Sequence, residues 1–365
     1  MTAYVRLRLR PQVFGLEHLR LEPRTIVAPN HRSDNDVPVL VTALYPKWAR
    51  AVARGVPWPT FATDDDALER GFLAGYPQHI PLWLRQLLWP IRVGGVLERN
   101  LQCVAVREPT TMLLAEVLRA DPHMALDGQL PPELRAALAR RAAARRRPPP
   151  ERAGDVLHGE YADLLWTPVE RDQVGRHGDV WRDHLRAAVR DFEQLVQSLR
   201  SGGLVVMYPE GELSPDGRIG PLKQGVASLA RRGRARWVQP VATCYDPLAG
   251  PRPRVYVSVA QPIVPQPGRL NSDLMGALRR ATPLTAGQIV AWQLGRGATS
   301  PAQLDAVASD WIDRARADER PIEPGLEGPR RRAILNGALR RALRRGATDP
   351  LIRRLSVELD DAHSQ

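Results

Sequence analysis

The alternation of strand-like and helix-like segments restricts the fold of this chain more than any other feature of its sequence. Short apolar runs rich in β-type residues lie at residues 24–28, 49–53, 91–97, 203–208, 237–243 and 254–260. Helix-like segments separate them, which is typical of α/β proteins, whose helices cover a sheet. The sequence therefore predicts an α/β fold with a mixed central sheet flanked by helices.

The length of the chain predicts more than one structural unit. At 365 residues it exceeds the size at which single hydrophobic cores stop growing. Residues 1–268 are predicted to form the α/β domain, interrupted at about residues 103–182 by a basic, partly helical insertion. Residues 269–365 predict a C-terminal helical unit. Its helices are expected at residues 270–281, 283–295, 301–317, 328–345 and 349–361.

The charge of the chain indicates an anionic partner. The net charge is +12, and arginine supplies nearly all of the positive charge. An aromatic content of only 5%, without zinc-finger spacing or an aromatic ribonucleoprotein motif, argues against nucleic acid, so none is expected as a partner. An anionic membrane surface is the other candidate.

Residues 79–95, HIPLWLRQLLWPIRVGG, are the segment best suited to a membrane. Leucines recur there at helical spacing beside Trp83 and Trp89, and arginine supplies the only charge. Two interpretations stay open, an interfacial membrane helix and an ordinary core helix with exposed arginines.

Other features concern cellular location and cofactors. The stretch MTAYVRLRLR lacks the apolar region of a signal peptide, and no uncharged run reaches the roughly 18 residues of a spanning helix. Cys103 and Cys244 fit no metal-ligand spacing and favour a reducing compartment. We therefore expect a cytoplasmic protein, peripherally associated with a membrane, with no transmembrane helix, metal or other cofactor.

The first candidate site is the polar segment NHRSDND, residues 30–36, directly after an apolar run. On one helix, His31 and Asp36 would point about 140° apart and could not share a face. With a strand ending near Ala28 and a helix starting at Asp36, the two side chains can converge at the carboxyl end of the strand. The segment predicts either a catalytic histidine–aspartate pair or merely a helix N-cap.

The same spacing occurs a second time, at His158 and Asp163 in HGEYAD. This copy lies in a polar region with no apolar strand before it. We interpret it as a chance match.

A second candidate site lies in residues 202–225, GGLVVMYPEGELSPDGRIGPLKQG. A buried strand is expected to run directly into Pro209-Glu210-Gly211. This sequence is compatible with a tight turn, yet an acidic residue at the carboxyl end of a strand also suits a site.

Together these segments resemble the glycerolipid acyltransferases, the 1-acylglycerol-3-phosphate acyltransferase family of the lysophospholipid acyltransferase superfamily. NHRSDND matches the asparagine-histidine-x-serine-x-x-aspartate motif, which contains the family's histidine-x4-aspartate pair, and YPEGE resembles the phenylalanine-proline-glutamate-glycine block. GGVLERN, residues 94–100, and VQPVA, residues 238–242, are similar to two further blocks, and the resemblance covers residues 12–262. It implies that His31 and Asp36 are catalytic. It also implies a substrate-binding set of Asn30, Ser33, Arg54, Arg99, Glu210, Gly211 and Pro240.

One departure from the family pattern concerns the acceptor. Relatives usually follow the glutamate-glycine pair with threonine-arginine-serine, whereas this chain has Glu212, Leu213 and Ser214. The arginine expected to hold an acceptor phosphate is therefore missing. Arg54, Arg99 or Arg218 would have to supply the positive charge, or the acceptor would lack a phosphate.

The resemblance implies an O-acyltransferase, and the chemistry of the residues fits this activity. A lipid hydroxyl is a weak nucleophile at neutral pH, and a histidine such as His31 suits the role of general base, with Asp36 fixing its tautomer. The predicted reaction moves a fatty acyl group from acyl-CoA or acyl-ACP to a lysophospholipid, foremost 1-acylglycerol-3-phosphate. The alternatives are a non-phosphate acceptor such as a glycolipid, and a non-catalytic basic protein that binds anionic membrane or nucleic acid.

Overall fold

The computed structural model describes residues 5, 11–64, 82–91, 101–170, 178–214, 216–297 and 300–363. The chain divides into two compact units. The first comprises Met1–Pro59 and Gln197–Gln365, and the second comprises Thr60–Val196. The predicted insertion at residues 103–182 lies inside the second unit, which also contains residues 60–102 and 183–196. The predicted C-terminal unit belongs with the α/β core.

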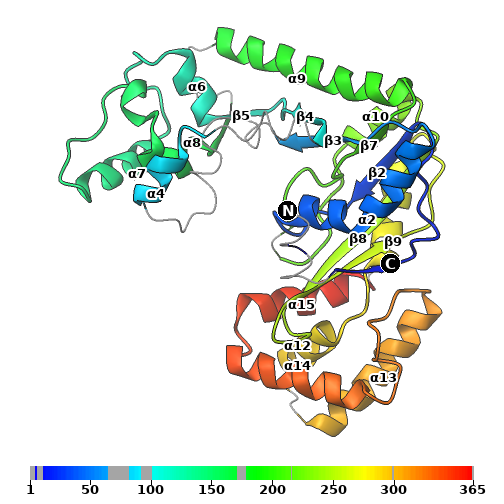
Figure 1. The fold of residues 1–365 in the computed structure, drawn as a ribbon. Coiled ribbons are helices and arrows are strands. Elements are labelled where there is room, and N and C mark those ends of the chain that lie inside the picture. Colours follow the sequence, from blue (N-terminus) through cyan, green and yellow to red (C-terminus); the bar gives the residue numbers. More distant parts are fainter. Residues whose placement is uncertain are drawn as a thin grey trace. The chain divides into compact units, whose positions relative to one another are not determined.

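The first unit is built on a mixed sheet (Figure 1). Its strands β1 (Pro11–Phe14), β2 (Thr25–Pro29), β7 (Leu204–Val206), β8 (Trp237–Asp246) and β9 (Arg254–Val259) lie in the order β1-β9-β8-β2-β7. β2 runs parallel to both of its neighbours, β7 and β8, whereas β8 and β9 are antiparallel. All five residues of β2 are buried, as expected for a strand with neighbours on both edges and helices on its faces. The predicted α/β class is thus confirmed.

Helix α2 (Asp36–Ala53) follows β2 after a turn of six residues, 30–35. The predicted strand at residues 49–53 is wrong, because these residues form the last turns of α2. Leu44, Trp48 and Ala51 are buried at spacings of four and three residues, so the helical periodicity continues past Pro46. A short apolar run such as residues 49–53 fits either a buried strand or a buried part of a helix, so it cannot distinguish between them.

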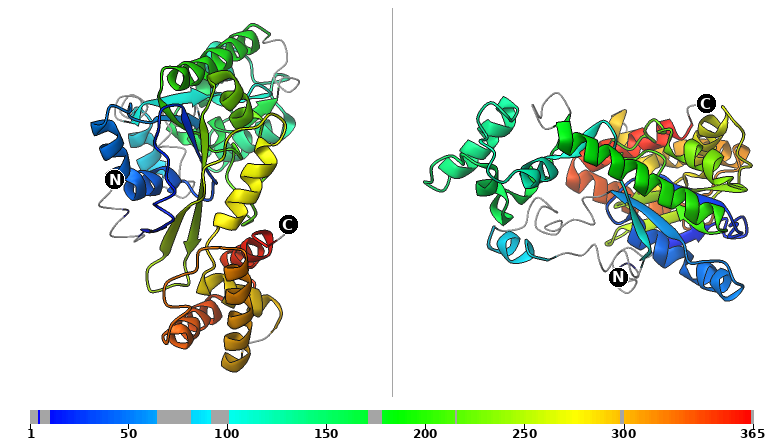
Figure 2. Two further views of the ribbon diagram at one scale, coloured as in Figure 1. Left: turned by 90° about the vertical axis from the view of Figure 1, so that its right-hand side faces the viewer. Right: turned by 90° about the horizontal axis from the view of Figure 1, so that it is seen from above.

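The helices of the C-terminal part match their predicted ranges closely. They are α11 (Leu270–Ala281), α12 (Ala286–Gly295), α13 (Pro301–Ala317), α14 (Arg331–Arg345) and α15 (Pro350–Asp361). The views in Figures 1 and 2 show α12 to α15, orange to red, gathered beyond one end of β8 and β9. α12 packs against α13, α14 and α15.

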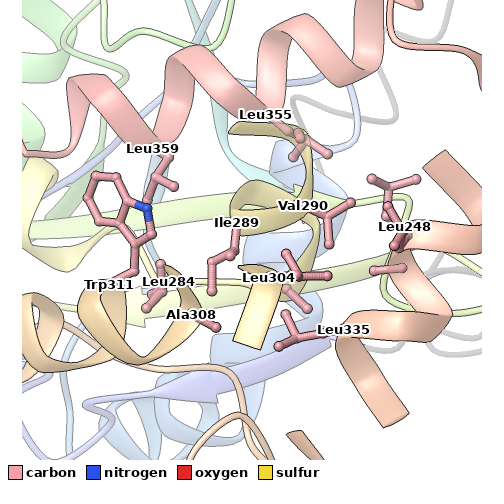
Figure 3. Packing of buried hydrophobic residues seen from close by; sticks show 14 of the residues in the cluster. Leu248, Leu284, Ile289, Val290, Leu304, Ala308, Trp311, Leu335, Leu355 and Leu359 are labelled. Atoms are coloured by element: carbon pink, nitrogen blue, oxygen red, sulfur yellow. The ribbon is translucent and has the colours of Figure 1, made fainter. Parts of the chain in front are cut away.

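A buried apolar cluster joins these helices (Figure 3). Ile289 and Val290 of α12 lie at its centre, and Trp311 and Leu359 reach it from α13 and α15. Leu248, in the loop after β8, belongs to the same cluster. Burial of side chains of this size stabilises the fold by about 1.5–3 kcal/mol each, so helices α12 to α15 and the loop after β8 share one core.

The second unit contains two pairs of short strands and several helices. β3 (Thr60–Asp64) pairs in parallel with β4 (Cys103–Val106), and β5 (Thr111–Leu113) pairs antiparallel with β6 (Pro168–Glu170). Helices α4 (Leu82–Leu88), α6 (Leu114–Ala120), α7 (Pro132–Ala143) and α8 (Ala162–Leu165) belong to it, as does most of α9 (Gly178–Arg200). The strand predicted at residues 91–97 lies outside the described residues, apart from Ile91.

Helix α4 contains the described part of the segment singled out for a membrane. Arg85 is buried and pairs with Asp163, with Nη1 and Oδ1 at 2.6 Å. Trp83 and Leu87 are instead 66% and 62% exposed. The exposed side chains of α4 thus include two large apolar residues beside Gln86, whereas the arginine of this helix, Arg85, is buried rather than exposed. Among the helices that the structure describes, none has the length and apolar composition needed to cross a membrane.

Candidate active site

His31 lies in the turn between β2 and α2, where sequence reasoning placed it. Because β2 runs between β8 and β7, this turn emerges at the carboxyl end of a central strand, the position at which α/β proteins build their sites. The His31 side chain is partly exposed, at 19%, whereas the Asp36 side chain is buried. The histidine is thus accessible while its partner is shielded from water.

The two predicted catalytic residues are in contact. His31 Nδ1 lies 3.0 Å from Asp36 Oδ2. The same carboxylate oxygen accepts the backbone N–H groups of Arg32 at 2.6 Å and Ser33 at 2.9 Å. Asp36 is the first residue of α2. The N-cap residue of this helix is Asn35, and the Asn35 side chain makes no capping hydrogen bond. Asp36 therefore closes the His31 turn rather than capping the helix.

Tyr245 completes the coordination of Asp36. Its hydroxyl donates a 2.7 Å hydrogen bond to Asp36 Oδ1, so both carboxylate oxygens have donors. Burial raises the pKa of Tyr245, and the nearby negative charge of Asp36 raises it further. The phenol therefore stays protonated and acts as a donor. Sequence reasoning missed this residue, because 209 positions separate it from Asp36 and nothing local marks it.

Tyr208 contacts the other side of His31. The two rings stack with centroids 4.4 Å apart and planes inclined by 28°. This tyrosine immediately precedes the Pro209-Glu210-Gly211 sequence, at the position where the family pattern has phenylalanine. Burial is also the main reason why the pKa of Tyr208 lies well above its ordinary value. The ring restricts the orientation of the imidazole.

Glu210, predicted to bind substrate, joins two loops. Its buried carboxylate accepts the backbone N–H of His31 at 2.6 Å and that of Gly220 at 2.6 Å. The Ser214 hydroxyl donates to it as well, and Ser214 N donates to His31 O at 2.9 Å. Gly211 turns the chain at φ +68°, where a Cβ would collide with the side chain of Lys223. These contacts make residues 210–220 and the His31 turn one connected structure.

Three other predicted binding residues have structural contacts. Asn30 is buried and bridges to β8, where its side chain accepts from Thr243 N at 2.6 Å. Pro240 lies buried within β8, paired in register with Ala28 of β2. Ser33 Oγ accepts a 3.2 Å hydrogen bond from Asn35 N. Asn30 and Pro240 thus stabilise the sheet beneath the site, and Ser33 lies in the turn itself.

Of the two predicted acceptor arginines, Arg54 alone lies among the described residues, and it is at the opposite end of α2 from the His31 turn. Arg54 is the exposed C-cap of α2, and the 18 residues of this helix separate it from Asp36 by roughly 27 Å at about 1.5 Å per residue. Arg54 is therefore far from the His31 turn, and its predicted role in acceptor binding stays a prediction. Arg99 and its GGVLERN block lie outside the described residues. Beside the turn, Glu212 is exposed and Leu213 half-buried.

The second histidine–aspartate match does not form a pair in the structure. Asp163 receives hydrogen bonds from both terminal nitrogens of Arg141 at 2.7 Å and contacts Arg85. His158 packs edge-on against Tyr161. The interpretation of HGEYAD as a chance copy agrees with these contacts. Within the described ranges no cluster of side chains suited to a metal ion occurs.

Comparison with known proteins adds a family match. The acyltransferase family model matches residues 161–244, a segment that contains Tyr208, Glu210 and Gly211 and begins well after His31. The crystal structure of the 1-acyl-sn-glycerophosphate (LPA) acyltransferase PlsC from Thermotoga maritima is similar at a TM-score of 0.38 and 14% sequence identity, covering 76% of this chain and 72% of that chain. The search of curated proteins found no match. The resemblance to the acyltransferase family is confirmed over the matched segment.

Proposed function

We propose that this protein is an O-acyltransferase of the lysophospholipid type, which transfers a fatty acyl group from an acyl thioester to a lipid hydroxyl. The family match over residues 161–244 supports acyl transfer. The observation on which the proposal chiefly rests is the 3.0 Å contact between His31 Nδ1 and the buried Asp36 carboxylate.

The geometry of this contact supports general-base catalysis. With the Nδ1 proton directed at Asp36, the lone pair of the neutral ring lies on Nε2. Nε2 removes the proton of the acceptor hydroxyl as its oxygen attacks the thioester carbonyl carbon. The tetrahedral intermediate then collapses, the carbon–sulfur bond breaks, and the thiolate takes the proton from His31. Asp36 stabilises the imidazolium formed in between.

No covalent enzyme intermediate is required by this scheme. Ser33 is the only hydroxyl within the NHRSDND segment, but its Oγ accepts from Asn35 N and no glycine-x-serine-x-glycine elbow surrounds it. The donor is acyl-CoA or acyl-ACP, whose phosphate groups or acidic surface suit a chain of net charge +12.

The acceptor we propose is a lysophospholipid, with 1-acylglycerol-3-phosphate as the first compound to test. A second acceptor class, lysolipids or glycolipids without a terminal phosphate, is favoured by two observations. Leu213 replaces the family's arginine beside the site, and Arg54 lies at the far end of α2. An exposed Glu212 also repels a phosphate at short range.

We further propose peripheral binding to anionic membranes through α4. Trp83 and Leu87 lie four residues apart on one helix face, and both are more than half exposed. Exposed apolar side chains at helical spacing, in a strongly basic chain, suit the interface of a bilayer with anionic lipids.

The test is an assay of thioester consumption. Acyl-CoA and acyl-ACP would be supplied with lysophosphatidate, a neutral lysophospholipid and a glycolipid, and the acylated product identified by mass spectrometry. Wild-type protein should acylate at least one acceptor, whereas His31→Ala should keep only a small residual rate. Product formation by His31→Ala at the wild-type rate would refute the general-base role, and no product with any acceptor would favour a non-catalytic binding protein.

A further inference from the structure

Helix α15 contacts the turn that holds His31. Arg354 Nη2 donates a 2.8 Å hydrogen bond to the backbone carbonyl of Arg32, the residue after His31. The side chain of Arg32 is itself buried, and its Nη2 lies 3.9 Å from Glu358 Oε1 on the same helix. α15 thus meets both the backbone and the side chain of the residue next to the candidate base.

The same helix also contacts the second loop of the site. Asp361 Oδ2 accepts the backbone N–H of Ile219 at 2.9 Å, and Asp361 Oδ1 is held by Arg279 of α11 at 3.1 Å. Gly217 packs so closely against the carbonyl of Arg354 that a Cβ there would overlap it. Three residues further on, the backbone N–H of Gly220 donates to the Glu210 carboxylate, which also accepts the backbone N–H of His31.

Arg32 links the two loops directly. Its Nη1 donates to Arg218 O at 2.6 Å, and its backbone N–H donates to Asp36 Oδ2. Arg32 and Glu358 are both almost completely buried, and Arg354 is a second positive charge close to Glu358.

We propose that α15 is part of the active site, and that Arg354, Glu358 and Asp361 are positioning residues that fix the His31 turn against the 210–220 loop. This inference rests on the proposed function, since it assigns these residues a role in acyl transfer. Catalytic groups displaced by about 1 Å can lose on the order of 10²-fold in rate. Helix α15 therefore acts in the reaction, although residues 350–361 lie far from both motifs in the sequence.

The principal test variant is Arg354→Met, with Arg353→Met as its matched control. Arg353 is the exposed neighbour on the same helix. We expect Arg354→Met to lower kcat by about 10- to 100-fold with KM for the thioester nearly constant, and Arg353→Met to resemble wild type. Arg354→Lys should recover part of the loss, because an ammonium can still donate to the Arg32 carbonyl. In a His31→Ala background, Arg354→Met should lower the residual rate no further.

A second readout does not depend on activity. In protein labelled with 13C-histidine, the ring signals of His31, assigned by their loss in His31→Ala, should shift in Arg354→Met and stay in place in Arg353→Met. Unchanged ring signals together with unchanged kcat would overturn the positioning role. If no variant, including wild type, transfers acyl groups, the proposed function fails, and the ring signals still decide whether α15 orders the turn. Should Arg354→Met not fold, Asp361→Asn, which keeps the shape of the side chain, replaces it in both measurements.

Discussion

Replacement of Asp36 by asparagine separates the charge of this residue from its shape. Asp36 Oδ2 accepts three donors, of which Arg32 N and Ser33 N are backbone groups that cannot reverse their polarity. An asparagine must therefore place its oxygen at the Oδ2 position and its NH2 group toward Tyr245. The tyrosine hydroxyl can rotate to accept from this group, since it is both donor and acceptor. The structure thus predicts that Asp36→Asn folds normally and loses only the negative charge.

The expected effect follows from the distance between the pair. At 3.0 Å and an effective dielectric constant of about 20, an imidazolium and a carboxylate attract each other by roughly 5.5 kcal/mol. The amide oxygen retains part of this interaction. The barrier should therefore rise by about 3–5 kcal/mol, which lowers kcat by roughly 10²- to 10⁴-fold.

The assay compares kcat and Tm of wild type, Asp36→Asn, His31→Ala and the double variant. The double variant should be little slower than His31→Ala, because residues that act as one unit are not additive. Asp34→Asn is the matched control, since it removes the same charge from an exposed position in the same turn. Asp163→Asn, from the chance copy, should also keep near-normal turnover, but it removes a partner of Arg141 and so affects stability. Wild-type kcat and Tm in Asp36→Asn would refute the His31–Asp36 mechanism.

Further predictions concern other parts of the molecule. Tyr245→Phe removes one hydrogen-bond donor from Asp36 and should lower kcat by about tenfold in the same assay. An unchanged kcat would show that this hydrogen bond does not contribute to catalysis. Leu213→Arg should raise activity on lysophosphatidate relative to neutral lysolipids, and equal effects on both would count against a role of this position in acceptor choice. Trp83→Glu combined with Leu87→Glu should abolish sedimentation with anionic vesicles while circular dichroism stays constant, and undiminished sedimentation would exclude α4 as the membrane contact. Burial, reinforced by the charge of Asp246, raises the pKa of Glu323 above its ordinary 4.5. The folded state therefore binds the carboxyl proton of Glu323 more tightly than the unfolded chain does. The resulting contribution to the free energy of unfolding is complete below pH 4.5 and is lost as the pH rises through the raised pKa of Glu323. Glu323→Gln should therefore flatten the dependence of Tm on pH in this range.

The parts of the site that sequence reasoning could place are those encoded within one turn. An apolar strand, a polar turn and a helix start follow one another within residues 25–36, so the convergence of His31 and Asp36 depends only on local geometry. The C-terminal helices were predictable for the same reason, because each helix has its own apolar periodicity and flanking Gly or Pro residues. Local rules suffice where the partners are neighbours in sequence.

Contacts between distant segments could not be predicted in this way. Tyr245 reaches Asp36 because β8 lies next to β2 in the sheet, and strand order has no local signature. The hydrogen bond from Arg354 to Arg32 spans 322 positions. The inclusion of residues 60–102 in the second unit reflects the pairing of β3 with β4, which are joined by about forty residues. In each case tertiary packing brings the two segments together, so the contact cannot be predicted from any short stretch of neighbouring residues.

The Glu210 loop shows why a motif can persist while acceptor choice changes. Both oxygens of Glu210 are engaged by groups of the loops themselves, and Ser214 is tied to Glu210 and to His31 O. Glu212 and Leu213 lie between these two fixed points, so their side chains can vary without moving the base. The family arginine at the position of Leu213 is therefore dispensable for the loop, although the glutamate is not. Glu210→Gln should then impair every acceptor alike, since an amide in its place sets an NH2 group against a backbone N–H, whereas substitutions at Leu213 should change only the preference among acceptors.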